Sequence, residues 1–76
     1  MPDVSNRMRA RWAAKAVDAF AKETCMEHEP FQDKLTDLVC DLLHLCDRRK
    51  ISFRRLLSLA RDHYDFEVQA EKGTKR

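Results

Sequence analysis

Apolar and small side chains recur at helical spacing in the first third of the chain. Four of them step by four residues: Met8, Trp12, Ala16 and Phe20. This spacing places them on one face of an α-helix, and Ser5 is a suitable N-cap in front of them. Six alanines between positions 10 and 21 also favour helix. The pattern predicts an amphipathic helix over about residues 5–24.

The second stretch has the clearest period. Its apolar residues step by four, three, four and three: Phe31, Leu35, Leu38, Leu42 and Leu45. Pro30 suits the first turn of this helix, because a proline has no N–H to leave unpaired there. We predict a helix over about residues 30–47. With Val39 and Leu43 beside it, the stripe covers nearly half the circumference, so we expect this helix to be central and to pack against both others.

A third helix is predicted over about residues 52–68, with Ser52 as its N-cap. Its expected core face is Phe53, Leu56, Leu57, Ala60 and Tyr64. The short charged connection before it predicts that the second and third helices are antiparallel neighbours, forming a hairpin. Residues 71–76 offer nothing apolar to bury, so we expect a disordered, flexible tail there. The fold class is therefore all-α, a small three-helix bundle forming a single domain over residues 1–70.

Leu59 and Phe66 lie beside the core face of the third helix, which then has more apolar surface than one antiparallel partner needs. Two interpretations remain open. The surplus packs on the first helix and closes the bundle, or it forms the interface of a homodimer or of a complex with another protein.

The composition narrows the function classes. The chain has 76 residues, 43% hydrophobic and 37% charged, with one Gly and two Pro. One glycine is too few for a Gly-rich phosphate loop or for the turns of a many-stranded β fold. So short a chain also has little room for a catalytic cleft. We therefore expect a non-enzymatic binding module. No apolar run is long enough to span a membrane, and no secretory signal is visible, so we expect a cytoplasmic protein without membrane contact. Three cysteines, an odd number, argue against a disulfide framework.

Charge is segregated along the chain. Residues 26–47 carry six acidic groups and one basic group, whereas residues 48–76 carry nine basic groups and four acidic ones. Five cations gather before and in the first turn of the third helix: Arg48, Arg49, Lys50, Arg54 and Arg55. They lie in a solvated loop and pair with the acidic second helix, or they receive the acidic surface of a partner, or they hold phosphate, in which case DNA is the partner.

An acidic row lies on the second helix, with Asp33, Asp37 and Asp41 one turn apart. Like charges at this spacing repel, so the row does not stabilise an isolated helix. It is explained by ion pairs with arginines of neighbouring helices or by docking of a basic partner. A third interpretation is metal binding or general acid catalysis, but a row on the outside of a small bundle lacks the shelter from water that a catalytic pair needs.

Two Cys/His pairs have spacings that could present zinc ligands. Cys25 and His28 are three positions apart, and Cys40 and His44 lie one helical turn apart. The pattern lacks a Cys-x-x-Cys motif, and a polar outer face explains Cys40 and His44 equally well. We predict no metal ion and no cofactor.

A resemblance covers residues 37–67. The pattern that carries it is Asp37-Leu38, Asp41-Leu42-Leu43-His44, Asp47, Phe53, Leu56-Leu57, Ala60-Arg61 and His63-Tyr64. It resembles short, mostly uncharacterised helical proteins of bacterial mobile elements such as plasmids, phages and integrated islands. Their turn often holds a small residue such as Gly where this chain has Arg49-Lys50. The resemblance implies a mobile-element setting, in which small non-enzymatic proteins regulate or inhibit host machinery by contact.

The sequence therefore predicts a protein-protein interaction module, with a mobile-element-encoded regulator or inhibitor of a host system as its biological form. The alternative is a small DNA-binding transcriptional regulator that uses the basic cluster 48–55. We predict no catalytic residue. The predicted partner-binding residues are Asp37, Asp41, Arg48, Arg49, Arg54, Arg55, Leu59 and Phe66.

Overall fold

The computed structural model describes residues 4–74, which form three α-helices and no strand. The helices are α1 (Asn6–Glu23), α2 (Phe31–Arg49) and α3 (Phe53–Thr74). The predicted all-α fold of three helices is confirmed, with starts within one residue of those expected. The end of α3 differs, because the helix continues through Thr74 instead of fading near residue 68. The predicted tail is therefore helical over 71–74, and residues 75–76 lie outside the described residues.

Two predicted N-caps are present. The Ser5 hydroxyl accepts a hydrogen bond from the backbone N–H of Met8 at 3.1 Å, and the Ser52 hydroxyl accepts one from that of Arg55 at 3.2 Å. Each hydroxyl satisfies one of the free N–H groups with which a helix begins. Pro30 takes the cap position of α2 without a side-chain bond, one residue earlier than the first turn in which it was expected.

Both interhelical turns begin with a non-glycine residue in the left-handed region: Cys25 has φ 58° and Lys50 has φ 57°. At the end of α2, the N–H of Ile51 donates to the carbonyl of Cys46 at 2.9 Å, and the N–H of Lys50 to that of Asp47 at 3.3 Å. Two hydrogen bonds with the same spacings along the chain close the end of α1. This is the Schellman arrangement, in which glycine is usual because it has no Cβ to clash.

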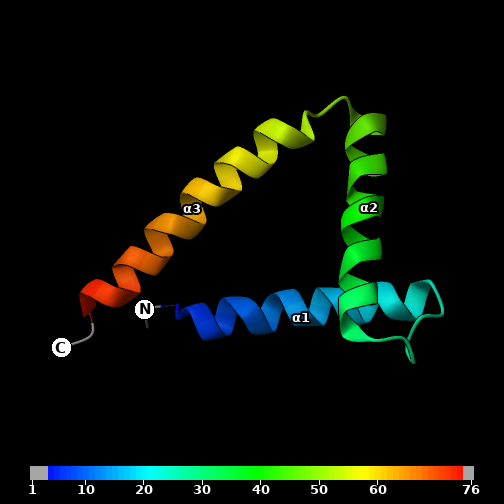
Figure 1. Cartoon of the computed structure of the whole chain (residues 1–76), viewed down its shortest axis with the longest axis horizontal. Helices are drawn as coiled ribbons and strands as arrows, with labels where there is room; N and C mark the ends of the chain where they lie inside the picture. The colour runs from blue at the N-terminus through cyan, green and yellow to red at the C-terminus, as the bar shows by residue number, and fades with distance from the viewer. Residues whose placement is uncertain (1–3, 75–76) are drawn as a thin grey trace.

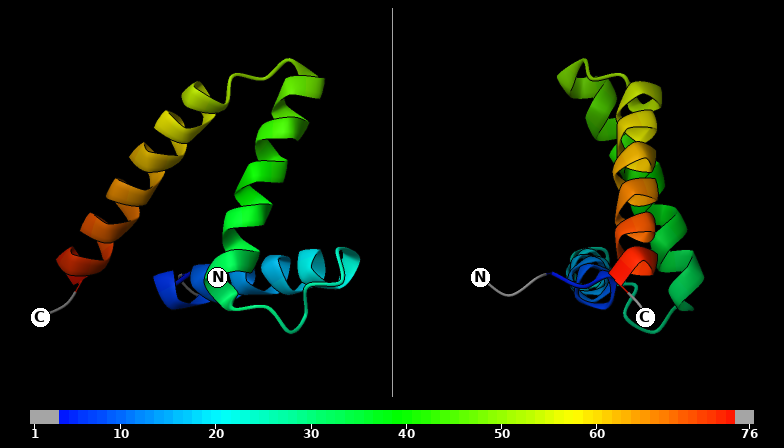
Figure 2. Two further views of the ribbon diagram at one scale, coloured as in Figure 1. Left: turned by 45° about the vertical axis from the view of Figure 1, so that its right-hand side comes forward. Right: turned by 90° about the vertical axis from the view of Figure 1, so that its left-hand side faces the viewer.

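The three helices form the sides of an open triangle (Figure 1). From the turn after α2, α2 and α3 run in opposite directions, as predicted, but they diverge and meet α1 at separate places (Figure 1). Viewed along α1, the lower ends of α2 and α3 lie beside it (Figure 2). The helix that contacts both others is α1, and the prediction that the second helix is central is wrong.

The tightest packing lies where α2 crosses α1. Val17 and Ala21 of α1 are 2% and 1% exposed, and they are the most buried described residues. The predicted core face of α1 is wrong in part, since Met8 is 41% and Trp12 52% exposed. The small side chain of Ala21 lets α2 approach on the neighbouring face, and this crossing decides which side of α1 is buried.

The core face predicted for α3 is mostly uncovered. Leu56, Leu57 and Tyr64 are 42%, 55% and 57% exposed, and only Phe53 of the bulky members is half-buried. The close hairpin packing that the short connection predicts does not form, because α3 leaves the turn at an angle to α2 (Figure 1). The apolar faces of the two helices therefore meet little of each other.

The open arrangement is visible in the dimensions. The radius of gyration is 15.0 Å, whereas a compact chain of this length has about 11 Å. The accessible surface is 7048 Å², compared with about 4,900 Å² for a folded monomer of 9.0 kDa. About 2,200 Å² more surface is exposed than a compact monomer exposes. Within residues 4–74, no helix combines the length and apolar character needed to cross a membrane.

Candidate interaction surface

The first part of the surface is the apolar face of α2, here called the α2 stripe. Its members are 39–52% exposed: Phe31, Leu35, Val39, Leu42, Leu43 and Leu45. Helical spacing puts them on one side of the helix, so they form a continuous strip rather than scattered residues. Folded monomers rarely leave a patch of this kind open to water.

The second part is the corresponding α3 stripe. Its members are 42–74% exposed: Leu56, Leu57, Leu59, Tyr64 and Phe66. Leu59 and Phe66, the predicted surplus residues, are 56% and 74% exposed, so their side chains do not close the bundle onto α1. A shallow groove of about 460 Å³ runs along the first half of this face, lined by Ile51, Ser52, Arg55, Leu56, Leu59, Ala60 and His63.

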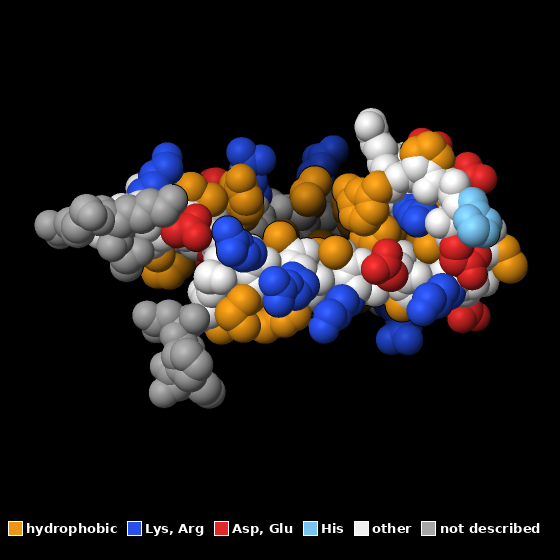
Figure 3. Space-filling model, turned by 90° about the horizontal axis from the view of Figure 1, so that it is seen from below, with side chains coloured by type: hydrophobic (Ala, Val, Ile, Leu, Met, Phe, Trp, Pro, Cys, Tyr) orange, Lys and Arg blue, Asp and Glu red, His pale blue; other side chains and the backbone are white. Residues whose placement is uncertain are grey.

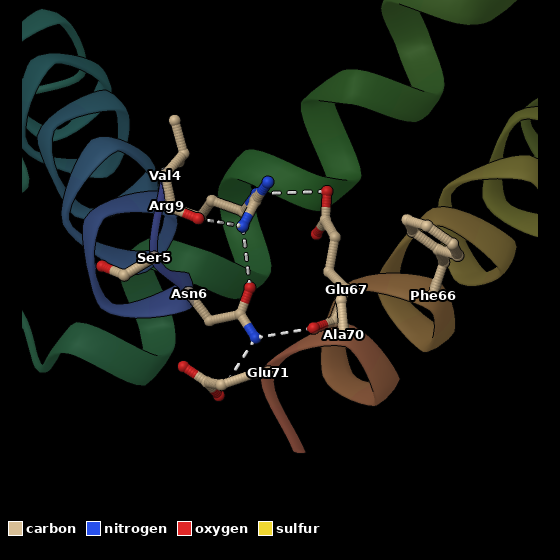
Figure 4. Close-up of a pocket in the computed structure, with 8 residues that line it drawn as sticks. All are labelled: Val4, Ser5, Asn6, Arg9, Phe66, Glu67, Ala70 and Glu71. Carbon is tan, nitrogen blue, oxygen red and sulfur yellow. Dashed lines mark hydrogen bonds and ion pairs between the residues drawn. The ribbon is translucent and has the colours of Figure 1, made fainter. Parts of the chain in front are cut away.

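The far half of α3 is held to the start of α1 by polar contacts, here called the α1–α3 corner (Figure 4). Arg9 forms an ion pair with Glu67 at 3.1 Å between Nε and Oε2, with both side chains about one-third exposed. The side-chain amide of Asn6 donates to the Glu67 carbonyl at 3.2 Å and to the Glu71 carboxylate at 3.1 Å. Arg9 also donates to the side-chain oxygen of Asn6 at 3.0 Å, which fixes the two donors relative to each other. The corner thus fixes one end of α3 without burying its apolar face.

The predicted basic cluster surrounds the α2–α3 turn, and all five of its residues are exposed. Among residues 4–74 the ion pairs are Arg9–Glu67 and Arg61–Asp65, and neither includes a member of the cluster. The expected pairing with the acidic second helix is therefore not formed within the described chain. The cluster remains available to a partner of opposite charge.

The predicted acidic residues Asp37 and Asp41 lie on α2 away from the middle of the α2 stripe, and both are exposed. Neither takes part in the two ion pairs of the described residues. Seen from below, on the side of α1, hydrophobic side chains reach the surface between Lys and Arg side chains, and several acidic ones lie at the right-hand end (Figure 3).

Part of the Cys/His set comes together. One ligand atom each of Cys40, Asp41 and His44 lies within 4.8 Å of the others, and all three residues are exposed. Cys25 and His28 do not join this group. A structural zinc site takes four ligands, so one helical turn supplies an incomplete and unsheltered set.

The structure places the eight predicted partner-binding residues on α2, on α3 and at the turn between them, without bringing them into one pocket. Leu59 and Arg55 line the same groove. Phe66 lines a separate hollow beside the α1–α3 corner, together with Ala70 and the first turn of α1. Sequence reasoning missed that corner, because Asn6 and Glu67 are 61 positions apart and no local pattern links them.

No protein-family model, curated protein or solved structure matches this chain. Function is therefore inferred from the exposure and charge of the surface itself.

Proposed function

We propose that this chain is a non-enzymatic protein-protein interaction module whose α2 and α3 stripes are covered by a protein partner. The observation that carries the proposal is the exposure of the two stripes, which contain eleven large hydrophobic residues at least 39% exposed each. Water-exposed apolar surface of this extent lowers the free energy when it is buried, at roughly 25 cal/mol per Å². The partner would supply the burial that the open triangle does not supply for itself.

The charges around the stripes fit the same proposal. Exposed acidic groups accompany α2 and exposed basic groups accompany the start of α3. Charged residues at the rim of an apolar interface select the partner and its orientation. We propose that Asp37, Asp41, Arg54 and Arg55 serve in this way, with Leu59 and Phe66 as apolar anchors.

Site-specific photo-cross-linking tests the proposal in producing cells. A benzophenone amino acid replaces Leu42 in the α2 stripe, or Leu59 or Phe66 in the α3 stripe. The matched control places it at Asp65, which is exposed on the side of α3 opposite the stripe. We expect discrete protein adducts from the three stripe positions and few or none from position 65.

Two results would overturn the proposal. One is the absence of adducts from all three stripe positions. The other is an equal yield from position 65, which would mean that contact is unrelated to the apolar stripes.

A second candidate function is DNA binding, favoured by the five exposed cations around the α2–α3 turn. One of the free N–H groups at the start of α3 is already taken, because the N–H of Arg55 donates to the Ser52 hydroxyl. Fluorescence anisotropy with a DNA duplex tests it: binding at about 50 mM salt that falls steeply as salt rises supports it, and no binding at that salt excludes it.

The biological setting of the module is also part of this proposal. A mobile-element regulator or inhibitor that acts by contact, in the cytoplasm, fits a short binding module that recognises one partner. The cross-linked protein, once identified by mass spectrometry, would test this setting.

A further inference from the structure

We infer that the partner covering the two stripes is a second copy of this chain, in a two-fold symmetric dimer in which α2 of each protomer packs against α3 of the other. This inference rests on the proposed function and names its partner.

The amount of uncovered surface agrees with a dimer. Each chain exposes about 2,200 Å² beyond what a compact monomer of 9.0 kDa exposes. Two chains that hide this excess in each other would bury about 4,400 Å² in total, within the roughly 2,000–5,000 Å² of obligate homodimers. The surplus is larger than a weak or transient contact would need.

Within one chain the α2 stripe and the α3 stripe do not cover each other. The short turn held by the Ile51–Cys46 and Lys50–Asp47 hydrogen bonds directs α3 away from α2, while Asn6 and Arg9 hold its far end on α1. A second copy carries the same two open stripes. Two-fold symmetry lets each α2 stripe receive the partner's α3 stripe, so both interfaces close with the same contacts.

The charges complement each other in this pairing. α2 carries four acidic groups and three basic ones, whereas the first turn of α3 carries two basic groups and no acidic one. On a helical wheel Asp41 and Asp47 border the two sides of the α2 stripe, and Arg54 and Arg55 border the two sides of the α3 stripe. None of these four residues takes part in an ion pair within the described chain. A dimer pairing α2 with α3 would bring opposite charges together at both rims.

The first measurement is the solution mass of the full chain by light scattering at micromolar concentration and at two salt concentrations. We expect about 18 kDa, twice the chain mass, at both. A mass of 9.0 kDa at both would overturn the inference.

The second measurement asks which helices meet. One variant carries Asp41→Lys with Asp47→Lys, and the other carries Arg54→Glu with Arg55→Glu. Each homodimer then has like charges at both interfaces, whereas the mixed dimer has opposite charges at both. Random pairing of equal amounts makes half of all dimers mixed. After mixing the variants at about 50 mM salt, we expect native mass spectrometry to show a ratio of mixed dimer to homodimers roughly tenfold above this random ratio, and the excess shrinks at high salt.

Control variants make changes of the same size on α1. Asp18→Lys with Glu23→Lys is mixed with Arg7→Glu with Arg11→Glu, at positions that are exposed. These should pair at random. Circular dichroism confirms that every variant retains its helix content. A dimer in which the α2 and α3 variants also pair at random would overturn the exchanged arrangement.

Failure of this inference is distinguishable from failure of the proposed function. A monomer in solution, with adducts in cells between the stripe positions and a different protein, removes the second copy and keeps the interaction module. A monomer with no adducts from the stripes removes both.

Discussion

The α1–α2 crossing and the length of α3 between its two ends, here called the α3 arm, both consist of amphipathic helix. They differ in what covers their apolar sides. At the crossing, Val17 and Ala21 are 2% and 1% exposed. On α3, Leu57, Leu59 and Phe66 are 55–74% exposed. Amphipathic helices of comparable pattern thus end in opposite environments.

The difference teaches which contacts hold the open fold. The crossing is held by apolar burial, which is strong and non-directional. The α3 arm is held at one end by a short hydrogen-bonded turn and at the other by the polar α1–α3 corner. An arm fixed only at its ends keeps an apolar side free for another molecule.

The largest expected effect is at the crossing. Val17→Asp places a charge in the tightest packing of the molecule, and an unpaired buried charge costs roughly 3–5 kcal/mol. That is about the whole stability expected of a chain this short, so urea titration followed by circular dichroism should show an unfolded variant. The control is Ala19→Asp on the exposed side of α1, expected to cost well under about 1 kcal/mol. Equal losses in both would show that the crossing is not the core.

The second effect is on the arm and concerns association. Leu59→Ser with Phe66→Ser removes two exposed anchors, and each lost apolar side chain should weaken partner binding at least about tenfold. Sedimentation over a range of protein concentrations measures the dissociation constant. Asp65→Ser, on the side of α3 opposite the stripe, is the matched control and should leave the dissociation constant unchanged. If the double variant associates like the unaltered chain, the α3 stripe is not an interface.

The third effect concerns the turn that separates the two regions. Lys50 has φ 57°, a conformation costly for a residue with a Cβ, so Lys50→Gly should raise the free energy of unfolding by about 1 kcal/mol. Arg49→Gly, one residue earlier at the last helical position of α2, should lower it by less than about 1 kcal/mol. Thermal melts of the pair give opposite signs if the turn is as described. A loss in both would place Lys50 in an ordinary helical conformation.

The smallest effect is expected at the α1–α3 corner. Arg9→Ala removes a partly exposed ion pair with Glu67, worth roughly 0.5 kcal/mol. Amide hydrogen exchange over residues 64–74 should become about twofold faster, while exchange around Val17 stays the same. Arg7→Ala is the control, because Arg7 is exposed and makes no ion pair within the described residues. Unchanged exchange in the Arg9 variant would mean that other contacts hold the arm.

Local features of the fold were predictable from residues close together in the chain. Ser5 and Ser52 marked helix starts, because a cap is a bond between neighbours three positions apart. The helix ends were harder. Cys25 and Lys50 occupy the left-handed positions where glycine is usual, so the ordinary signal for a helix end is missing. Gly73, the one glycine, lies within α3 instead.

The candidate surface was predictable only in part. The surplus of Leu59 and Phe66 followed from their places on the flank of α3, because helical period is a property of the sequence. The exposure of Tyr64 and of the whole α2 stripe was not predicted, because both were expected to face another helix. The Asn6–Glu67 contact was also missed, because it joins opposite ends of the chain.

The sequence by itself determined three amphipathic helices, their starts, the segregation of charge and a surplus of apolar surface, since each depends on neighbours within about one helical turn. Only the tertiary structure decided that α1 contacts both other helices, that Val17 and Ala21 are the most buried described residues, and that α2 and α3 diverge from Lys50. The physical reason is that an apolar stripe lowers the free energy when any complementary surface covers it. The helical period of the sequence identifies which face of each helix is apolar. The two short turns set the directions of the helices, and these directions determine which surface covers each apolar face.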